Sequence, residues 1–169
     1  MKKKLIRLLV IIIPLLTLDQ VTKYFAKEIL AEKTVPVIKG VLEFRYLENR
    51  GAVWGSLQNQ LLLLVTVTII LSAVLLVFYF KMPDGKKNTP LLYLVPIILA
   101  GAIGNFIDRI VYNYVIDFIY FKIINFPIFN VADIYVTCST IILAILIIFY
   151  YKDEDFQWMQ FKKAKTGDE

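Results

Sequence analysis

Four long apolar stretches, separated by polar segments, dominate the hydrophobic pattern of the chain. The longest, residues 61–80, contains 20 consecutive residues without a charge. A helix that crosses the hydrocarbon core of a bilayer needs about 20 predominantly apolar residues. The pattern therefore predicts a single membrane domain, residues 1–169, with four transmembrane helices at about residues 5–26, 61–80, 91–110 and 133–151.

The segment between the first two stretches, residues 31–60, is about 30 residues long, which favours an ordered or functional loop over a plain connection. Residues 42–46 alternate between apolar and charged side chains, and this period of two indicates a half-buried strand. Residues 49–51 supply a turn, and residues 52–55 are expected to form a returning strand. The predicted fold class is an all-α integral membrane protein with four transmembrane helices, a small extracytoplasmic β-sheet and a short outer helical segment.

Composition and charge agree with a membrane location. Hydrophobic residues make up 59% of the chain and the mean hydropathy is +0.67, well above the values typical of soluble proteins. With both termini inside the cell, the inner side holds 11 basic residues against 8 outside, and four of the 11 flank the first helix. The net charge of +5 therefore reflects topology, and no segment has the pattern of a nucleic-acid binder.

The N-terminal run also resembles a secretory signal peptide, but no small-x-small cleavage site follows it, so retention as a first span is expected. An amphipathic helix on the inner surface and a disordered tail both fit residues 152–169. The chain has no His, which excludes a Ser-His triad and a His-ligated zinc site. Its single cysteine, Cys138, lies in the fourth span, where we expect a small packing residue.

Two aspartates, Asp117 and Asp133, stand in surroundings that otherwise suit a bilayer. Ionisable groups at membrane depth are costly, so a chain retains them mainly for chemistry or transport. Two carboxylates held close together share one proton, because both cannot ionise comfortably. The ionised member can then take a proton from water while the protonated member polarises a carbonyl, as in aspartic proteases.

Asp133 also has a purely structural interpretation. Asn130 could be the N-cap of the fourth helix, with Asp133 at the third helical position, where a negative charge is favourable. Asp117 lies between an isoleucine and a phenylalanine and has no comparable structural explanation.

Further polar residues gather at the same expected outer surface. Asp19 and Lys23 have the i,i+4 spacing of a helical ion pair, and mutual neutralisation is the leading interpretation. Asn105, Asp108 and Arg109 fall on one face of the third span, and the last two could equally be snorkelling charges at the interface.

Small and aromatic residues mark two other segments. Residues 101–104 contain two glycines three apart, a spacing that allows close helix packing. Aromatic residues crowd the segment before the fourth span, where an interfacial belt and a substrate platform are both open. They are Tyr112, Tyr114, Phe118, Tyr120, Phe121, Phe126 and Phe129.

Two other functional classes stay open at this point. A transporter or ion channel would use the acids as cation sites, but it would carry polar residues through the membrane, and the second span has no charged residue. A structural membrane subunit would merely pair the acids with Arg109 and Lys23, and it predicts that an Asp117→Asn substitution is silent.

Five motifs, taken in order, resemble the motif set of the bacterial lipoprotein signal peptidase family (signal peptidase II). They are DQVTK at 19–23, NRGAVWG at 49–55, GAIGNFIDR at 101–109, VIDF at 115–118 and FNVAD at 129–133. One position departs mildly from the family pattern, since Trp54 stands where many members carry Phe.

The resemblance implies an intramembrane aspartic endopeptidase, without metal or cofactor, that removes the signal peptide of prolipoproteins just before a diacylglyceryl-modified cysteine. Asp117 and Asp133 match the catalytic pair. The positions that match substrate-binding or supporting residues are Asn49, Gly51, Asn105, Asp108, Arg109, Asn130, Ala132, Asp19 and Lys23.

The resemblance also implies partners and a location. The partners are lipid-modified prolipoproteins, membrane lipids and globomycin-type inhibitors, without nucleic acid, and we expect a monomer. The location is the bacterial cytoplasmic (inner) membrane, multi-pass, with both termini cytoplasmic and the active site near the outer face.

Overall fold

Four long helices form the body of the protein, of which the computed structural model describes residues 1–51 and 60–159. By length and composition, each of the four is able to cross a membrane. Their bounds agree with the predicted spans to within about one helical turn. They are α1 (Lys2–Leu30), α2 (Leu61–Lys81), α3 (Thr89–Tyr112) and α4 (Val131–Phe149).

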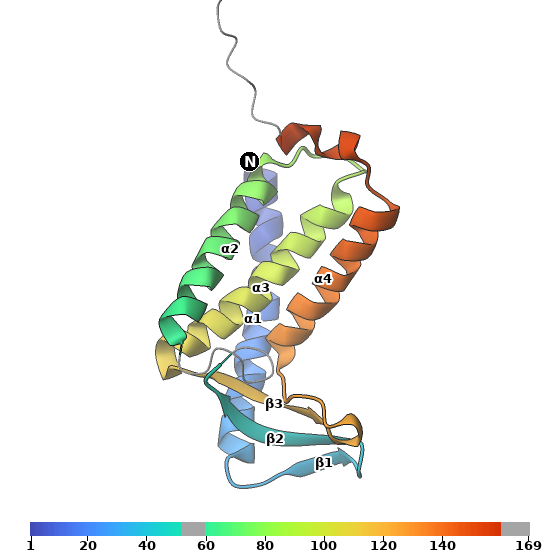
Figure 1. Cartoon of the computed structure of the whole chain (residues 1–169). Coiled ribbons are helices and arrows are strands. Elements are labelled where there is room, and N and C mark those ends of the chain that lie inside the picture. Colours follow the sequence, from blue (N-terminus) through green and yellow to red (C-terminus); the bar gives the residue numbers. More distant parts are fainter. Residues whose placement is uncertain (52–59, 160–169) are drawn as a thin grey trace, which may run out of the picture.

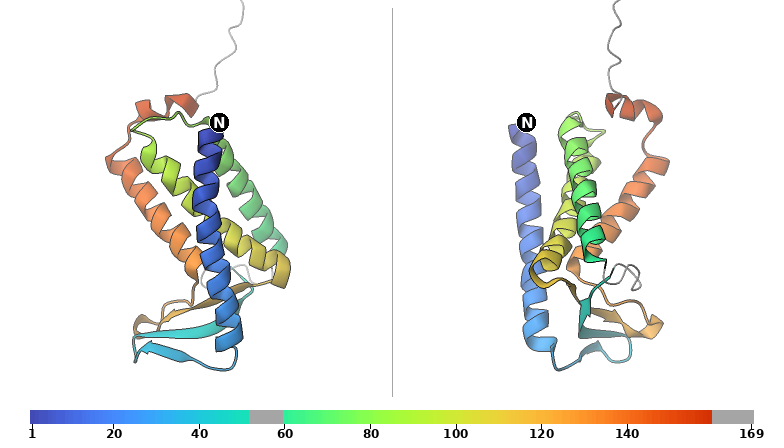
Figure 2. Two further views of the ribbon diagram at one scale, coloured as in Figure 1. Left: turned by 180° about the vertical axis from the view of Figure 1, so that it is seen from behind. Right: turned by 60° about the vertical axis from the view of Figure 1, so that its left-hand side comes forward.

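Helix α3 is the central helix of the bundle. Figures 1 and 2 show α2 and α4 on either side of it, with α1 crossing behind. Just over half of the apolar part of α3 (56%) is buried, compared with 11% or less in the other three helices. The outer faces of those three are therefore apolar and exposed, as expected for surfaces that contact lipid.

Glycines at 101 and 104 allow the central helix to lie against two neighbours. A Cβ added at Gly101 would lie 2.5 Å from the backbone oxygen of Ala132 in α4. A Cβ at Gly104 would collide with the carboxylate of Asp19 in α1. The close packing predicted from the two glycines is thus observed, and it brings α1, α3 and α4 together at one level.

A three-stranded antiparallel sheet covers one end of the bundle (Figure 1). It consists of β1 (Val35–Ile38), β2 (Leu42–Asn49) and β3 (Val115–Phe121), in the order β1-β2-β3. Helix α3 ends at Tyr112 and is capped by Asn113, which has a left-handed backbone (φ 65°), and the chain then turns directly into β3. Leu47 is paired with Asp117 and Asn49 with Val115, so the end of β2 lies beside the start of β3.

The strand predicted at residues 42–46 is confirmed, since it lies within β2. Its observed partners are β1 and β3, whereas the returning strand expected at 52–55 lies outside the described residues, as does Trp54. β3 was not predicted, because its first four residues are all buried and therefore show no alternation. A short 3-10 helix, Lys122–Ile124, follows β3.

The opposite end of the bundle is closed by the C-terminal segment (Figure 1). The 3-10 helix η3 (Asp153–Met159) lies there, with the Trp158 ring 5.0 Å from that of Phe78 in α2. The helical alternative for the tail therefore holds for Asp153–Met159, although the helix is of the 3-10 type. Residues 160–169 lie outside the described residues.

Candidate active site

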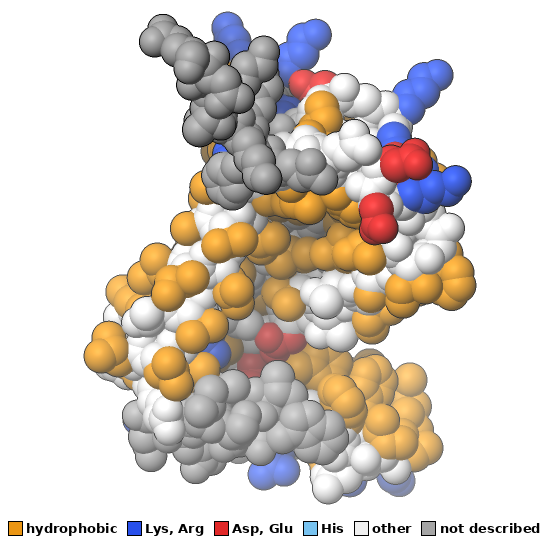
Figure 3. Space-filling view, turned by 45° about the horizontal axis from the view of Figure 1, so that its top comes forward, with side chains coloured by type: hydrophobic (Ala, Val, Ile, Leu, Met, Phe, Trp, Pro, Cys, Tyr) orange, Lys and Arg blue, Asp and Glu red, His pale blue; other side chains and the backbone are white. Residues whose placement is uncertain are grey.

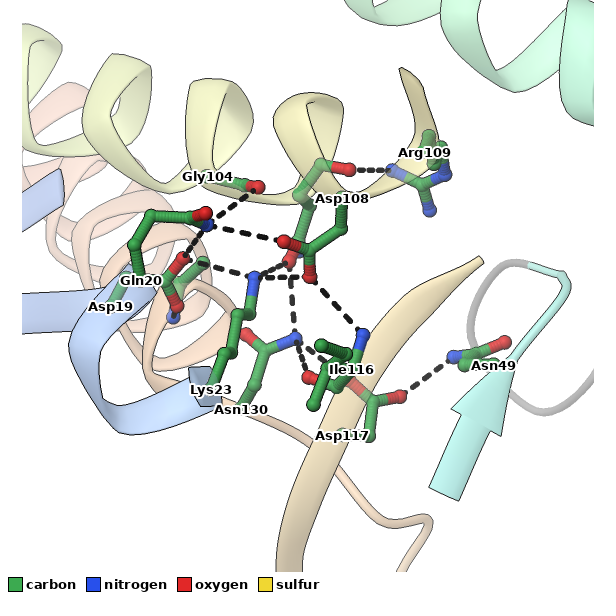
Figure 4. Close-up of polar contacts among 12 residues, drawn as sticks. Asp19, Gln20, Lys23, Asn49, Gly104, Asp108, Arg109, Ile116, Asp117 and Asn130 are labelled. Carbon is green, nitrogen blue, oxygen red and sulfur yellow. Dashed lines mark hydrogen bonds and ion pairs between the residues drawn. The ribbon is translucent and has the colours of Figure 1, made fainter. Parts of the chain in front are cut away.

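Polar side chains converge where the bundle meets the sheet (Figure 4). They come from the second half of α1, the last turns of α3, the strands β2 and β3, and the first turn of α4. All eleven residues singled out from the sequence lie in this region, where they line one cavity or support the residues that line it.

A buried ion cluster forms the base of the site. The Lys23 ammonium lies 2.9 Å from a carboxylate oxygen of Asp19 and 2.9 Å from one of Asp108. All three side chains are almost completely buried, with 0–1% of each residue exposed. The amide of Gln20 donates to both carboxylates, at 3.1 Å each, so the two negative charges share one cation and one amide.

The ion pair predicted from the spacing of residues 19 and 23 is therefore present. The snorkelling alternative is wrong for Asp108, because its carboxylate is buried beside Lys23 instead of lying at a membrane surface. Gln20 is a site residue that sequence reasoning missed, and the signal that could have found it is its amide next to Asp19 within the DQVTK motif.

The same cluster fixes the two segments that carry Asp117 and Asp133. The other carboxylate oxygen of Asp19 accepts the backbone N–H of Ala132, at 2.9 Å, in the first turn of α4. The carboxylate of Asp108 accepts the backbone N–H of Ile116, at 3.1 Å, in β3. The residues directly before Asp117 and Asp133 are thus each held by a buried carboxylate, and Figure 4 shows the contact of Asp108 with Ile116.

Asp117 is buried, with 1% of its surface exposed, and each of its carboxylate oxygens accepts an amide. Asn130 Nδ2 donates to one oxygen at 2.7 Å, and Asn49 Nδ2 donates to the other at 2.8 Å. Burial, and then the nearby charge of Asp133, raise the pKa of Asp117 to about 7, although the two amide bonds act in the opposite direction. Asp117 therefore titrates near neutral pH.

Asp133 closes the N-terminus of α4 as predicted by the structural interpretation. Its backbone N–H donates to Asn130 Oδ1 at 2.9 Å, and its carboxylate accepts the backbone N–H of Asn130 at 3.1 Å, which is a capping box. The second carboxylate oxygen accepts Asn105 Nδ2 at 2.7 Å and the residue lines the cavity. Capping and a role in chemistry are therefore compatible.

Two asparagines connect the acids to each other and to the ion cluster. Asn130 Nδ2, which donates to Asp117, also donates to Asn105 Oδ1 at 3.0 Å. That oxygen in turn accepts the Lys23 ammonium at 2.8 Å. A continuous polar chain thus runs from Lys23 through the two amides to both aspartates, in a region where fully satisfied networks fix side-chain positions.

The cavity that both acids line has a volume of about 650 Å³. In Figure 3, acidic atoms are recessed in a hollow of a largely hydrophobic surface. Its apolar walls come from residues 126–129, after β3, and from the face of α4 that continues to Cys138. The expectation for Cys138 is wrong, because its side chain is exposed along this wall instead of packing inside the bundle.

Arg109 lines the cavity beside the end of β2. Its guanidinium donates to the backbone oxygens of Asn105 and Gly51, both at 3.5 Å. The Gly51 N–H donates to Asn49 Oδ1 at 3.0 Å. The Asn49 side-chain amide that contacts Asp117 is therefore also held by the backbone two residues further along the chain. The aromatic segment is divided, since Phe118 of β3 is buried in a cluster with Ala26 and Leu30 of α1, whereas Phe126 and Phe129 line the cavity.

No group of three or more His, Cys, Asp or Glu side chains that could hold a metal ion occurs in residues 1–51 and 60–159.

Known proteins resemble this chain over most of its length. A family model described as Signal peptidase (SPase) II matches residues 11–149. The lipoprotein signal peptidase of Caldanaerobacter subterraneus subsp. tengcongensis is 43% identical over 143 residues, covering 83% of this chain and 95% of that protein. The lipoprotein signal peptidase of Clostridium tetani is 42% identical over 145 residues, covering 83% and 91%.

Solved structures agree with these relatives. One described as a bacterial membrane enzyme at 2.3 Å resolution has a TM-score of 0.73 and 32% identity, covering 94% of both chains. A second, at 1.9 Å, has a TM-score of 0.71 and 33% identity over 85% of this chain and 94% of its own. On the family match and the identities, the chain belongs to the signal peptidase II family, the aspartic-type lipoprotein signal peptidases of bacterial membranes.

Proposed function

We propose that Asp117 and Asp133 activate a water molecule that cuts diacylglyceryl-modified prolipoproteins just before the lipidated cysteine. The observation that carries this proposal is that both acids line one cavity while sharing the support of Asn130. Family membership supports removal of prolipoprotein signal peptides, and the cavity adds a place where a peptide bond could meet the two carboxyl groups.

The surroundings of the two acids suggest different starting protonation states. Asp117 titrates near neutral pH because it is buried and close to a second acid. Asp133 lies in the first turn of α4, where the helix dipole stabilises negative charge, and it accepts hydrogen bonds from Asn105 and Asn130. We therefore assign the proton of the resting pair to Asp117 and the negative charge to Asp133.

From that starting state, the hydrolysis balances without any other reagent. Asp133 takes a proton from water as the water oxygen attacks the scissile carbonyl carbon, and Asp117 gives its proton to the carbonyl oxygen. Asp133 then gives its proton to the leaving nitrogen while Asp117 recovers a proton from the collapsing gem-diol. Both acids return to their starting states.

The remaining site residues have supporting roles in this proposal. Arg109 presents a guanidinium on the cavity wall, where it could hold a substrate carbonyl. Residues that shape the pocket or orient the acids are Asn49, Gly51, Asn105, Asn130 and Ala132. Residues that hold the surrounding elements together are Asp19, Lys23 and Asp108.

The proposal includes an orientation in the bacterial cytoplasmic membrane. All four helices cross it, both termini face the cytoplasm, and the sheet and the cavity lie at the outer face. The basic flank of α1 supports this orientation. In a Cys138→Ala background, a membrane-impermeant thiol reagent added to intact cells should label Lys39→Cys in the sheet region and spare Lys86→Cys at the other end.

A lipid-anchored substrate fits this position. Confinement of enzyme and substrate to one leaflet raises their effective concentration. The apolar cavity wall along α4 suits the lipid-linked part of the precursor or the apolar part of its signal peptide. Globomycin-type cyclic peptides are expected to compete for the same cavity, and a monomer carries the complete set of residues.

The test is processing of a lipidated precursor in cells that lack their own enzyme. Asp117→Asn and Asp133→Asn should each insert normally but lower the cleavage rate by about a hundredfold or more. Asp84→Asn, in the loop at the other end with its side chain 62% exposed, is the matched control and should cleave normally. Normal processing by either cavity variant would overturn the assignment.

A further inference from the structure

Four side chains close a ring beside the cavity, and two of them, Glu48 and Arg50, line it. The Arg50 guanidinium donates to one carboxylate oxygen of Glu48 at 2.9 Å. The Tyr46 hydroxyl approaches the other oxygen at 3.5 Å and lies 3.3 Å from the hydroxyl of Tyr114. The ring closes because the Arg50 guanidinium lies over the Tyr114 ring, 5.5 Å from its centroid.

The ring is anchored to the end of α1 by a second cation. The rings of Tyr112 and Tyr114 stack with their centroids 5.8 Å apart, and the Lys27 ammonium lies 4.4 Å above the Tyr112 ring. Each contact alone is weak at a partly exposed site. Together they connect the end of β2, the residue directly before β3 and the last turns of α1 and α3.

The position of the ring relates it to Asp117. Tyr46 and Glu48 lie two residues apart in β2 and project to one side of the strand. Arg50 directly follows the strand, and its guanidinium reaches back to Glu48. Asn49, between the last two, projects to the other side and donates to Asp117 at 2.8 Å. Fixing the side chains on both sides of Asn49 therefore fixes the direction of its amide.

We propose that the Tyr46–Glu48–Arg50–Tyr114 ring is a positioning device that holds the Asn49 amide on Asp117 during catalysis. This inference rests on the proposed function of Asp117. None of the four is a catalytic residue, since the ring acts only through Asn49.

Several other groups face Asp117 and must be separated from this effect. Asp133 in α4 and Lys23 in α1 act on it through their charges, as does Arg109 in α3, and Asn130 donates to its other oxygen. Within residues 1–51 and 60–159, none of these four residues forms a hydrogen bond or ion pair with a ring residue. Changes in the ring should therefore leave them in place.

The direction in which the pKa of Asp117 moves distinguishes a positioning role of the ring from an effect of the Glu48 charge alone. Loss of the Asn49 hydrogen bond raises the pKa of Asp117, since that bond favours the ionised form. Loss of the negative charge of Glu48 would instead lower it, because a nearby negative charge disfavours ionisation. Glu48→Gln removes both the charge and the ring, so the direction observed shows which effect dominates.

The experiment measures kcat and KM against pH with the full-length enzyme in detergent and a synthetic lipidated peptide. For Glu48→Gln and Tyr114→Phe, the alkaline limb of the kcat profile should move up by about half a pH unit, a threefold change in protonation ratio. We expect kcat to fall about threefold from less exact positioning, with little change in KM.

Glu43→Gln is the matched control, because Glu43 lies on the same strand and pairs with Lys122 at 2.7 Å, far from Asn49. Its profile should match the wild type. In an Asn49→Ala background, Tyr114→Phe, which removes no charge, should cause no further shift, since the ring then has nothing to hold.

Three results would each overturn the inference. They are an alkaline limb that stays in place or moves to lower pH in Glu48→Gln, an equal movement in Glu43→Gln, and a further movement when Tyr114→Phe is added to Asn49→Ala. Asp117→Asn in the same assay reports on the proposed function separately. If Asp117→Asn cleaves normally the function fails, whereas an inactive Asp117→Asn with an unmoved Glu48→Gln limb rejects only the ring.

Discussion

Two buried lysines on α1, one near each end, have partners of different kinds. Lys4, 6% exposed, donates to the backbone oxygens of Phe80, at 3.0 Å, and Met82 at the C-terminal end of α2. Lys23, 1% exposed, contacts side-chain oxygens of Asp19, Asp108 and Asn105.

The difference teaches how burial relates to function in this chain. Backbone carbonyls are present at the end of every helix, so Lys4 needs no special partner residues to join α1 to α2. Lys23 needs acids and an amide from two helices, and these same groups support Asp117 and Asp133. In this chain the buried lysine paired with side chains lies at the end that carries the proposed active site, and the one paired with backbone makes an ordinary helix contact.

The largest expected effect comes from removing each lysine in turn. Lys23→Met should lower the free energy of unfolding by about 3–5 kcal/mol, because it leaves two buried carboxylates without a cation. Lys4→Met should cost about 1–3 kcal/mol, the usual penalty for losing a donor to buried acceptors. Thermal unfolding in detergent and precursor processing measure the two effects, and only Lys23→Met should also abolish cleavage.

Equal losses of stability for the two variants, with cleavage retained in both, would contradict the distinction between the two ends.

A smaller effect on stability and cleavage is expected from adding one methyl group to a glycine at the sheet end of the bundle. Gly104→Ala would push against the Asp19 carboxylate, so it should cost about 1–3 kcal/mol of stability by overpacking. It should also slow cleavage about tenfold or more, because Asp19 holds the first turn of α4.

Gly85→Ala, in the loop at the opposite end, is the matched control. An added Cβ there meets nothing within 4 Å, so stability should change by no more than about 0.5 kcal/mol. A cleavage rate for Gly104→Ala equal to that of Gly85→Ala would show that the packing of α1 against α3 does not matter for the site.

Local patterns were sufficient to predict part of this architecture. The four long apolar helices follow from apolar length, β2 from its alternation, the Asp19–Lys23 pair from i,i+4 spacing and the Asn130–Asp133 box from helix-start chemistry. Each of these depends on residues close together in the sequence, so the chemistry that creates it is visible without the fold.

Long-range contacts could not be derived in the same way. β3 lacks alternation because residues 115–118 are buried on both faces, so its pairing with β2 was missed. Asp19 reaches the backbone N–H of Ala132 across 113 positions, and only the packing of α1 and α4 against the glycines of α3 brings them together. The convergence of Asp117 and Asp133 on one cavity was predicted by family resemblance and by the expected topology, whereas the asparagines that link them emerge from the structure.

The most direct measurement is an infrared titration of Asp117 in the wild-type protein and in Asp133→Asn, with Asp117→Asn used to identify its carboxyl band. The wild type should titrate near pH 7, and the Asp133→Asn variant should titrate clearly lower, since the like charge that raises the pKa of Asp117 is then absent. A carboxyl group that titrates at the same pH in both proteins would contradict the claim that the two acids act as one pair.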